Sequence, residues 1–154
     1  MRIEHLVDCQ EHLEAVAAWQ QAEFGYLNPA VSLEQRQDRL RGALQRSDLP
    51  VTLVAFSEEG RPVGAASVLS RTITHPHLTP WLSTVAVPQA FRGQGIASSL
   101  SLRAVREARR LGFQSIHLFT PHNESLYARL GWETFERSSH HGLPIALMRR
   151  TTGG

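Results

Sequence analysis

The stretch FRGQGIASSLSLRAVREARRLGF, residues 91–113, places Gly93 and Gly95 directly before a long amphipathic run. The residues WLSTVAV (81–87) that precede it predict a strand, so this segment predicts a strand, a glycine-rich turn and a helix over 93–112. The backbone N–H groups of such a turn converge at a helix start, where the helix dipole favours negative charge. The expected ligand of the turn is therefore a phosphate group.

Two common phosphate-binding motifs do not match this turn. A dinucleotide fingerprint requires a third glycine where Ser98 stands, and a Walker loop requires a lysine, whereas all 16 basic residues of this chain are arginines. The pattern Arg92-x-x-Gly95-x-Ala97 remains, a short turn whose small residues let the backbone approach a pyrophosphate. A tight turn made of glycines for packing alone is the alternative for this motif by itself.

Length and composition narrow the class of protein. The 154 residues predict a single domain at 1–150 followed by a disordered tail at 151–154, and a hydrophobic share of 42% is typical of a globular protein. Cys9 is the single cysteine, the first residues lack the apolar core of a signal peptide, and no apolar run approaches the ~20 residues that cross a bilayer. We therefore expect a cytoplasmic protein. A net charge of +2 spread along the chain does not favour nucleic-acid binding.

Hydrophobic periodicity and turn residues predict an alternation of strands and helices. The expected strands are 1–7, 51–56, 62–72, 81–87, 115–120, 133–137 and 145–150. The expected helices begin near Glu11, at Ser32 as N-cap of 32–46, at 93–112, and at 123–132 with Gly131 as the stop signal. A proline-punctuated loop, 73–80, and a turn, 138–144, complete the order. The pattern predicts a mixed α/β fold.

Two longer motifs carry a resemblance to a known family. TVAVPQAFRGQGIASSLSLRAVREARRLGF (84–113) resembles the signature of the GNAT superfamily of N-acetyltransferases, and LFTPHNESLYARLGW (118–132) looks like its second motif. The resemblance is specific over 81–138, and small bacterial members look closest. It implies a central, mostly antiparallel sheet with helices on both faces and a cofactor cleft between the fourth and fifth strands. It also implies acetyl-CoA as cosubstrate, released as coenzyme A.

The resemblance assigns roles to particular residues. It implies a coenzyme-binding loop and helix start made of Arg92, Gly93, Gln94, Gly95, Ile96, Ala97 and Ser98. The backbone of Val85 and Val87 is implied to contact the pantetheine and the thioester. Asn123 is implied as a further coenzyme contact and Tyr127 as the general acid.

The general base is where the chain departs from the family pattern. Many members carry a glutamate in the fourth strand, where this chain has Ser83 and Thr84. His117 is a possible base, although an isolated histidine in a strand is more often structural. Glu23, Glu124 and His75 are weaker candidates. A pocket that desolvates the amine lowers its pKa, so a dedicated base is not strictly required.

The resemblance implies an acyl-CoA-dependent N-acyltransferase that moves an acetyl group to a primary amine by direct attack in a ternary complex. The alternative is a non-catalytic acyl-CoA-binding or regulatory module, because a fold can keep a cofactor site after losing its chemistry. We expect a monomer or homodimer with no nucleic-acid or membrane partner. Loops 24–31, 73–80 and 138–143 are expected to frame the acceptor, and their sequences do not select among antibiotic, polyamine, amino acid and protein N-terminus. The pairs His75/His77 and His140/His141 lack further ligands at metal-binding spacing, so no metal is expected.

Overall fold

The computed structural model describes residues 1–72 and 75–153. Its strands are β1 (Arg2–His5), β2 (Val51–Phe56), β3 (Pro62–Leu69), β4 (Trp81–Ala86), β5 (Ser115–Thr120), β6 (Glu133–His140) and β7 (Leu143–Thr151). Its α-helices are α1 (Leu13–Phe24), α2 (Leu33–Arg41), α3 (Ile96–Arg110) and α4 (Glu124–Arg129). The strands form one seven-stranded sheet in the order β1-β2-β3-β4-β5-β7-β6, in which β4 and β5 pair in parallel and the other described neighbours pair antiparallel. The expected mixed fold with a mostly antiparallel sheet is confirmed.

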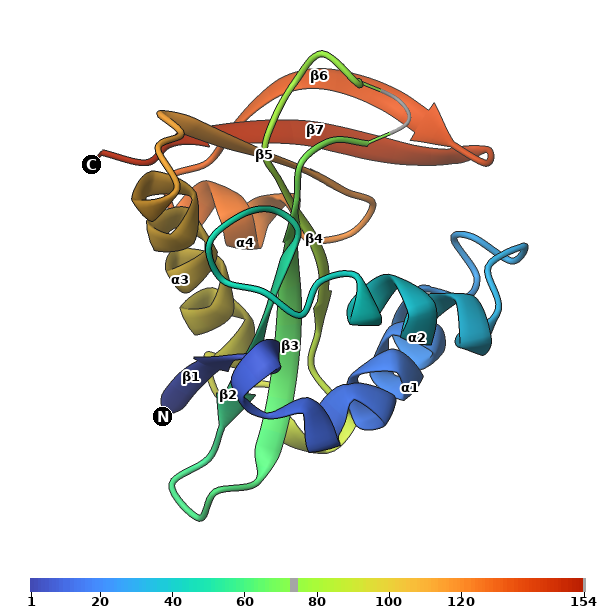
Figure 1. Cartoon of the computed structure of the whole chain (residues 1–154). Helices are drawn as coiled ribbons and strands as arrows, with labels where there is room; N and C mark the ends of the chain where they lie inside the picture. Colours follow the sequence, from blue (N-terminus) through green and yellow to red (C-terminus); the bar gives the residue numbers. More distant parts are fainter. Residues whose placement is uncertain (73–74, 154) are drawn as a thin grey trace.

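Helices cover both faces of the sheet. Figure 1 shows α3 and α4 on one face and α1 with α2 on the other. The strand β2 is buried throughout because both of its faces are covered: Leu53 packs in the core beneath α3, and Val54 packs in a second core beneath α1. Among the residues that the structure describes, every helix is too short or too polar to cross a bilayer.

Local sequence signals set several helix ends as expected. Ser32 caps α2 in a capping box, in which its Oγ accepts a hydrogen bond from the Gln35 backbone N–H at 3.1 Å. Gly131, with a φ of 92°, follows the end of α4, where the Trp132 N–H donates to the Tyr127 carbonyl at 3.0 Å. The α2 helix ends at Arg41, five residues before the predicted end, because Gly42 ends the periodic pattern early.

The C-terminal hairpin differs from the prediction. Residues 138–140 and 143–144, expected in a turn, extend β6 and β7, and the turn consists of His141 and Gly142, both with positive φ. The tail is also corrected over its described part. Thr151 ends β7, and buried Thr152 donates to the Gln114 and Phe113 carbonyls. Residues 73–74 of the predicted 73–80 loop, and residue 154 of the tail, lie outside the described residues.

A buried ion cluster fixes α3 against the first strand. The Glu107 carboxylate on α3 is 3% exposed and lies 2.5 Å from His5 Nε2 and 2.8 Å from an Arg110 nitrogen. Burial alone raises the pKa of Glu107, but the hydrogen bonds from Arg110 and His5 hold this pKa below its ordinary value. The helix whose start carries the glycine turn is thus anchored near its other end.

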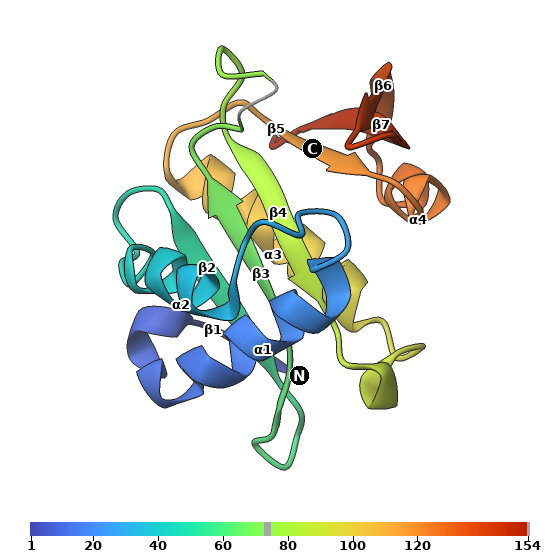
Figure 2. The ribbon, with the colours of Figure 1, turned by 90° about the vertical axis from the view of Figure 1, so that its right-hand side faces the viewer.

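The strands β4 and β5 share a single described register pair, Trp81 with His117. The His117 N–H donates to the Pro80 carbonyl at 3.0 Å, just before β4 begins. Figure 2 shows the two strands side by side at their starts and then running apart. The sheet therefore opens between β4 and β5, beside the start of α3.

Candidate active site

The glycine turn ends at the uncapped start of α3. Gly95 is the N-cap residue in the left-handed conformation, with a φ of 78°, and no side chain caps the helix. The first bond of the helix runs from the Ser99 N–H to the Gly95 carbonyl at 3.0 Å, so the N–H groups of the three residues before Ser99 lack helical partners. These donors, together with the helix dipole, suit an anionic group.

A pocket of about 210 Å³ lies against this turn. It is lined by Val87, Phe91, Arg92, Gly93, Gly95, Ile96, Ala97, Ser98 and Leu126. A Cβ built on Gly93 or Gly95 would meet no atom within 4 Å, so both glycines are required for their positive φ and not for packing. The predicted loop residues therefore come together around open space, and Leu126 brings α4 to the same pocket. The residues present fit a pyrophosphate.

Arg92 holds the loop to its surroundings. Its Nε donates to the Val87 carbonyl at 3.0 Å, and its terminal nitrogen forms an ion pair with Glu23 of α1. The guanidinium thus joins the end of β4 to the helix on the opposite face. Glu23, a weaker candidate for the base, is engaged in this pair.

The helix α4 carries the two residues of the second motif. Asn123 is its N-cap residue, and the Asn123 N–H donates to Thr120 Oγ1 at 2.9 Å. Tyr127 is 6% exposed and packs edge-to-face on Trp132, with ring centroids 6.0 Å apart. Burial raises the pKa of Tyr127 to about 12, so the phenol is protonated at neutral pH. Among the described residues its hydroxyl has no hydrogen-bond partner.

A bulge in β4, which sequence reasoning missed, lies where the strands diverge. Ser83 pairs with Ser67 and Ala86 with Ala65, so two residues, Thr84 and Val85, face one residue of β3. Thr84 has a φ of 50°, a conformation that costs a β-branched residue ~1–3 kcal/mol. Its Oγ1 accepts a hydrogen bond from Nε2 of Gln20, a buried residue of α1, at 3.3 Å. No local signal in TVAVP predicts this conformation.

His117 lies on the opposite face of the sheet from Tyr127. Its β5 neighbours Ile116 and Leu118 belong to the same core as Tyr127, whereas the His117 ring contacts Trp81, with centroids 5.3 Å apart, and Phe135 at 6.1 Å. The Nδ1 atom donates to the Pro80 carbonyl at 3.1 Å, and burial lowers the pKa of His117. The side chain is neutral at pH 7 and 4% exposed.

Loops from distant parts of the chain meet on the α1 face. The Tyr26 hydroxyl and His122 Nε2 are hydrogen bonded at 3.0 Å, and His140 Nε2 donates to Asn28 Oδ1 at 2.8 Å. His75 Nε2 donates to Glu136 at 3.1 Å. We call these segments, 24–31, 75–80 and 138–143 with His122, the loop rim. The loops 24–31 and 138–143, both expected to frame the acceptor, are thereby joined by a hydrogen bond. The described part of the third loop, 75–80, is bonded to β6 of the same hairpin.

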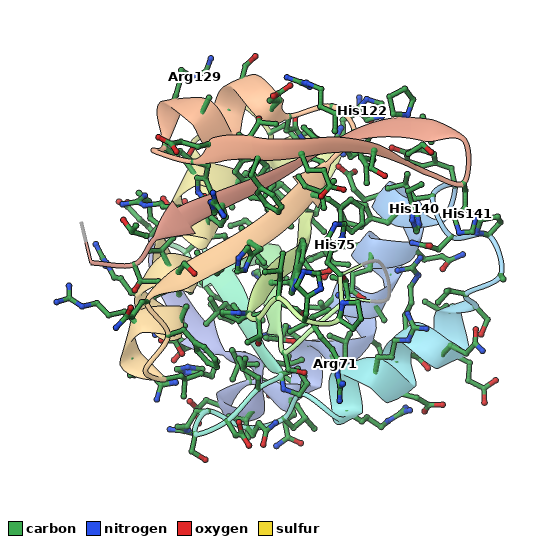
Figure 3. The ribbon with its side chains drawn as sticks, turned by 90° about the horizontal axis from the view of Figure 1, so that it is seen from above. Arg71, His75, His122, Arg129, His140 and His141 are labelled. Carbon is green, nitrogen blue, oxygen red and sulfur yellow. The ribbon has the colours of Figure 1, made fainter. Side chains whose placement is uncertain are left out.

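Near the loop rim, two acidic side chains are paired, whereas one arginine forms no ion pair with a described residue. Glu136 is bonded to His75, and Glu124 is bonded to both terminal nitrogens of Arg137. Arg71, at the end of β3, forms no ion pair with the described residues. Figure 3 shows His75, His140 and His141 on the side of the molecule that carries the hairpin tip, with Arg129 well away from them. Within the described ranges, no three His, Cys, Asp or Glu residues are placed to hold a metal ion.

The fold of this chain is similar to that of several solved acetyltransferases. A ribosomal-protein-alanine N-acetyltransferase from Brucella melitensis superposes with a TM-score of 0.76 at 23% identity, over 98% of this chain and 99% of its own. An aminoglycoside 6'-N-acetyltransferase complexed with coenzyme A also gives 0.76, at 13% identity, over 100% and 98%. These likenesses show the fold.

Sequence comparison gives the family. Residues 13–132 match the model of the acetyltransferase (GNAT) family, and the chain belongs to this family. The N-alpha-acetyltransferase 80 of Mus musculus is 35% identical over 108 residues, which are 66% of this chain and 34% of the mouse protein. The match therefore spans about a third of the length of this curated relative.

Proposed function

We propose that the protein is an acetyl-CoA-dependent N-acetyltransferase that transfers the acetyl group to a primary amine by direct attack in a ternary complex. The observation that carries the proposal is the shared pocket, in which the uncapped start of α3 and α4 meet beside the opening between β4 and β5. A phosphate-bearing cosubstrate bound there would extend toward the opening, and Tyr127 follows Leu126, the α4 residue that lines the pocket.

The roles follow the position of each residue. The backbone N–H groups of residues 93–98 would bind the pyrophosphate, with Arg92 holding the loop against β4. The N–H at Val87 lies on a strand end that β5 has left, which supports a contact between the coenzyme and the backbone of Val85 and Val87. Asn123 stands at the start of the helix that borders the same pocket.

Tyr127 would donate a proton to the departing thiolate. A thiol with a pKa of ~8.5 needs only ~2 kcal/mol of help at neutral pH, so a protonated phenol nearby is a sufficient acid. The raised pKa of Tyr127 keeps the phenol protonated at neutral pH but also makes it a weaker acid than the thiol, so the transfer is completed by reprotonation of the phenolate. The amine nitrogen attacks the thioester carbon and forms the C–N bond, the C–S bond breaks, and the thiolate takes the phenol proton. The proton that the nitrogen loses passes through water to the phenolate, so the products are the amide and the free thiol of coenzyme A.

The acceptor side is more compatible with an α-amine than with a polycation. Deprotonating a lysine-like amine at neutral pH costs ~5 kcal/mol, whereas an α-amine with a pKa of ~7.8 costs only ~1 kcal/mol, so it needs no strong base. Glu124 and Glu136, which flank the loop rim in the sequence, are already paired, and the described loop rim itself contains no carboxylate to bind further positive charges. We therefore propose an α-amine of an amino acid or peptide as acceptor. The name of the mouse relative, an N-alpha-acetyltransferase, supports this choice.

His117 is a possible base with a stronger structural role. It lies on the face opposite Tyr127, as a base for an acceptor entering from that side would. Its burial and its bond to Pro80 support a packing role. An α-amine acceptor can bind in its neutral form, so no base is needed to deprotonate it. In that case the role of His117 is to pack beneath the acceptor site. A cytoplasmic location and a monomeric or dimeric state stay predictions.

The test is thiol release from acetyl-CoA across a panel of amines. The panel contains peptides with free and blocked N-termini, single amino acids, spermidine and kanamycin, each at the same concentration. We expect turnover with free peptide or amino-acid α-amines and little with the two polycations. Coenzyme A binding without thiol release for any amine would favour the non-catalytic module. Equal or faster turnover of spermidine would contradict the α-amine proposal while leaving the enzyme class intact.

A further inference from the structure

The bulge in β4 depends on a buried amide from α1. Gln20 is 6% exposed and continues the stripe of Leu13, Val16 and Ala17, which packs on the sheet. An apolar residue would complete this stripe, yet the chain places a primary amide there. The only hydrogen bond of that side chain to a described residue runs from Nε2 to Thr84 Oγ1 at 3.3 Å. The polar group at this position is therefore explained by Thr84.

Thr84 requires such support. Its φ of 50° lies in the left-handed region, which a β-branched residue adopts only when its surroundings impose it. Apart from Thr84 and from His141 in the hairpin turn, the described residues with positive φ are all glycines. Thr84 is thus a strand residue in the left-handed conformation, which threonine disfavours. The hydrogen bond from Gln20 of α1 supports this conformation.

The conformation at residue 84 decides where the next peptide groups point. Thr84 lies three residues after Trp81, which is the register partner of His117. It directly precedes Val85, in the part of β4 that no longer pairs with β5. If Thr84 relaxed to extended backbone, the bulge would be lost, the following N–H groups would point to the opposite edge of the strand, and the side chains would change faces. The Gln20 side chain, which lies on the α1 face of the sheet, thereby sets the orientation of the β4 backbone that borders the opening.

We propose that Gln20 is a positioning residue for acyl transfer: its hydrogen bond holds Thr84 in the left-handed conformation and so orients the backbone of β4 toward the thioester. This inference rests on the proposed function. Gln20 acts through Thr84 and is not assigned a contact with either substrate.

The test is a double-mutant cycle of Gln20→Leu and Thr84→Gly, because glycine adopts positive φ without support. Gln20→Leu should lower kcat at saturating acetyl-CoA about tenfold with an unchanged melting temperature, since leucine completes the apolar stripe. Thr84→Gly should lower kcat about threefold, because glycine also visits other conformations. Adding Gln20→Leu to the Thr84→Gly variant should then change kcat less than twofold.

Each result separates this role from a merely structural one. A tenfold loss that persists in the Thr84→Gly background would overturn the proposal, because Gln20 would then act independently of residue 84. Parental kcat in Gln20→Leu would reduce Gln20 to a core residue. If the parent itself transfers no acetyl group, the enzyme assignment fails instead. In that case the Cα chemical shift of residue 84 decides, since it distinguishes left-handed from extended backbone and should change in Gln20→Leu.

Discussion

The coenzyme side and the acceptor side of the site adopt the same unusual backbone conformation by different means. On the coenzyme side, residues 87–98 and 123–132, the left-handed φ of 78° falls on Gly95, which adopts it freely. On the acceptor side, made of the β4 bulge, His117 and the loop rim, a φ of 50° falls on Thr84, which does not. The first conformation is encoded locally, and the second is imposed by α1.

The two sides also differ in how far apart their parts lie in the sequence. The coenzyme side consists of two continuous stretches, of which the first has Gly95 at a helix start and the second has Gly131 after a helix end. The acceptor side is joined by contacts such as the one between Asn28 and His140, which are 112 residues apart. We therefore expect single substitutions on the coenzyme side to have large effects, and those on the acceptor side to have smaller effects shared among several contacts.

The largest effect is expected for Tyr127→Phe, which deletes the proton donor and keeps the packing on Trp132. Turnover at saturating acetyl-CoA should fall about 100-fold, at the low end for general acid catalysis because a thiolate leaves readily. Coenzyme A affinity and melting temperature should change little. The chain's other tyrosine supplies the control: Tyr26→Phe removes an exposed hydroxyl on the acceptor side and should cost at most a few-fold in turnover. Parental turnover of Tyr127→Phe would remove this residue from the mechanism.

Gly95→Val should weaken coenzyme A binding at least tenfold, by about the loss of one charge-assisted hydrogen bond. A side chain at this φ is strained and projects into the open space that the pyrophosphate would occupy. Gly60→Val is the matched control, because Gly60 has a φ of 85° and equally open surroundings in the distant β2–β3 turn. Both variants should lose stability, and only the first should lose affinity in calorimetric titration. Equal affinity of the two would end the phosphate-loop interpretation.

Asn28→Ala deletes the contact that ties the α1–α2 loop to the C-terminal hairpin. Loss of this hydrogen bond, whose net contribution is ~1 kcal/mol, should raise the KM for the acceptor about fivefold. Coenzyme A affinity should be unaffected. A variant in which coenzyme A affinity falls and the acceptor KM does not would break the division into two sides.

His117→Ala should have the smallest effect on turnover, less than about threefold, and should mainly lower the free energy of unfolding. Because burial lowers the pKa of His117, protonation favours the unfolded chain, so its contribution to stability is complete above the ordinary value of 6.5 and declines as pH falls through that range. The difference in unfolding free energy between parent and variant should therefore be larger at about pH 7.5 than at about pH 5. Equal melting temperatures with a 100-fold slower rate would instead assign His117 as the base.

Prediction from the sequence succeeded where structure is encoded by neighbouring residues. Ser32 as an N-cap, Gly131 as a stop signal and the helix behind Gly95 each depend on contacts within a few residues. The motif resemblance then supplied the mostly antiparallel sheet, which periodicity alone does not give, whereas the parallel pairing of β4 with β5 was not predicted.

Prediction failed where the deciding contact is distant in the chain. The bulge at Thr84 depends on Gln20, 64 residues away, and nothing in the strand's own sequence indicates it. The anchored Thr152 was expected in a frayed tail because its partners, the carbonyls of Phe113 and Gln114, lie 39 and 38 residues earlier. The extended C-terminal hairpin was missed because polar SSHHGLP is typical of a turn, although only two of its residues form one.

The pocket at the start of α3 and the loop rim lie on opposite faces of the sheet, on either side of the place where β4 and β5 diverge. Under the proposed function, the donor and the acceptor would each have their own entrance, and neither would have to leave before the other binds. In kinetic terms, this geometry favours a sequential mechanism over a ping-pong one, with free coenzyme A competing with acetyl-CoA and not with the amine. It also means that a single molecule joining coenzyme A to an amine through a short linker would occupy both entrances at once and close the sheet from each side.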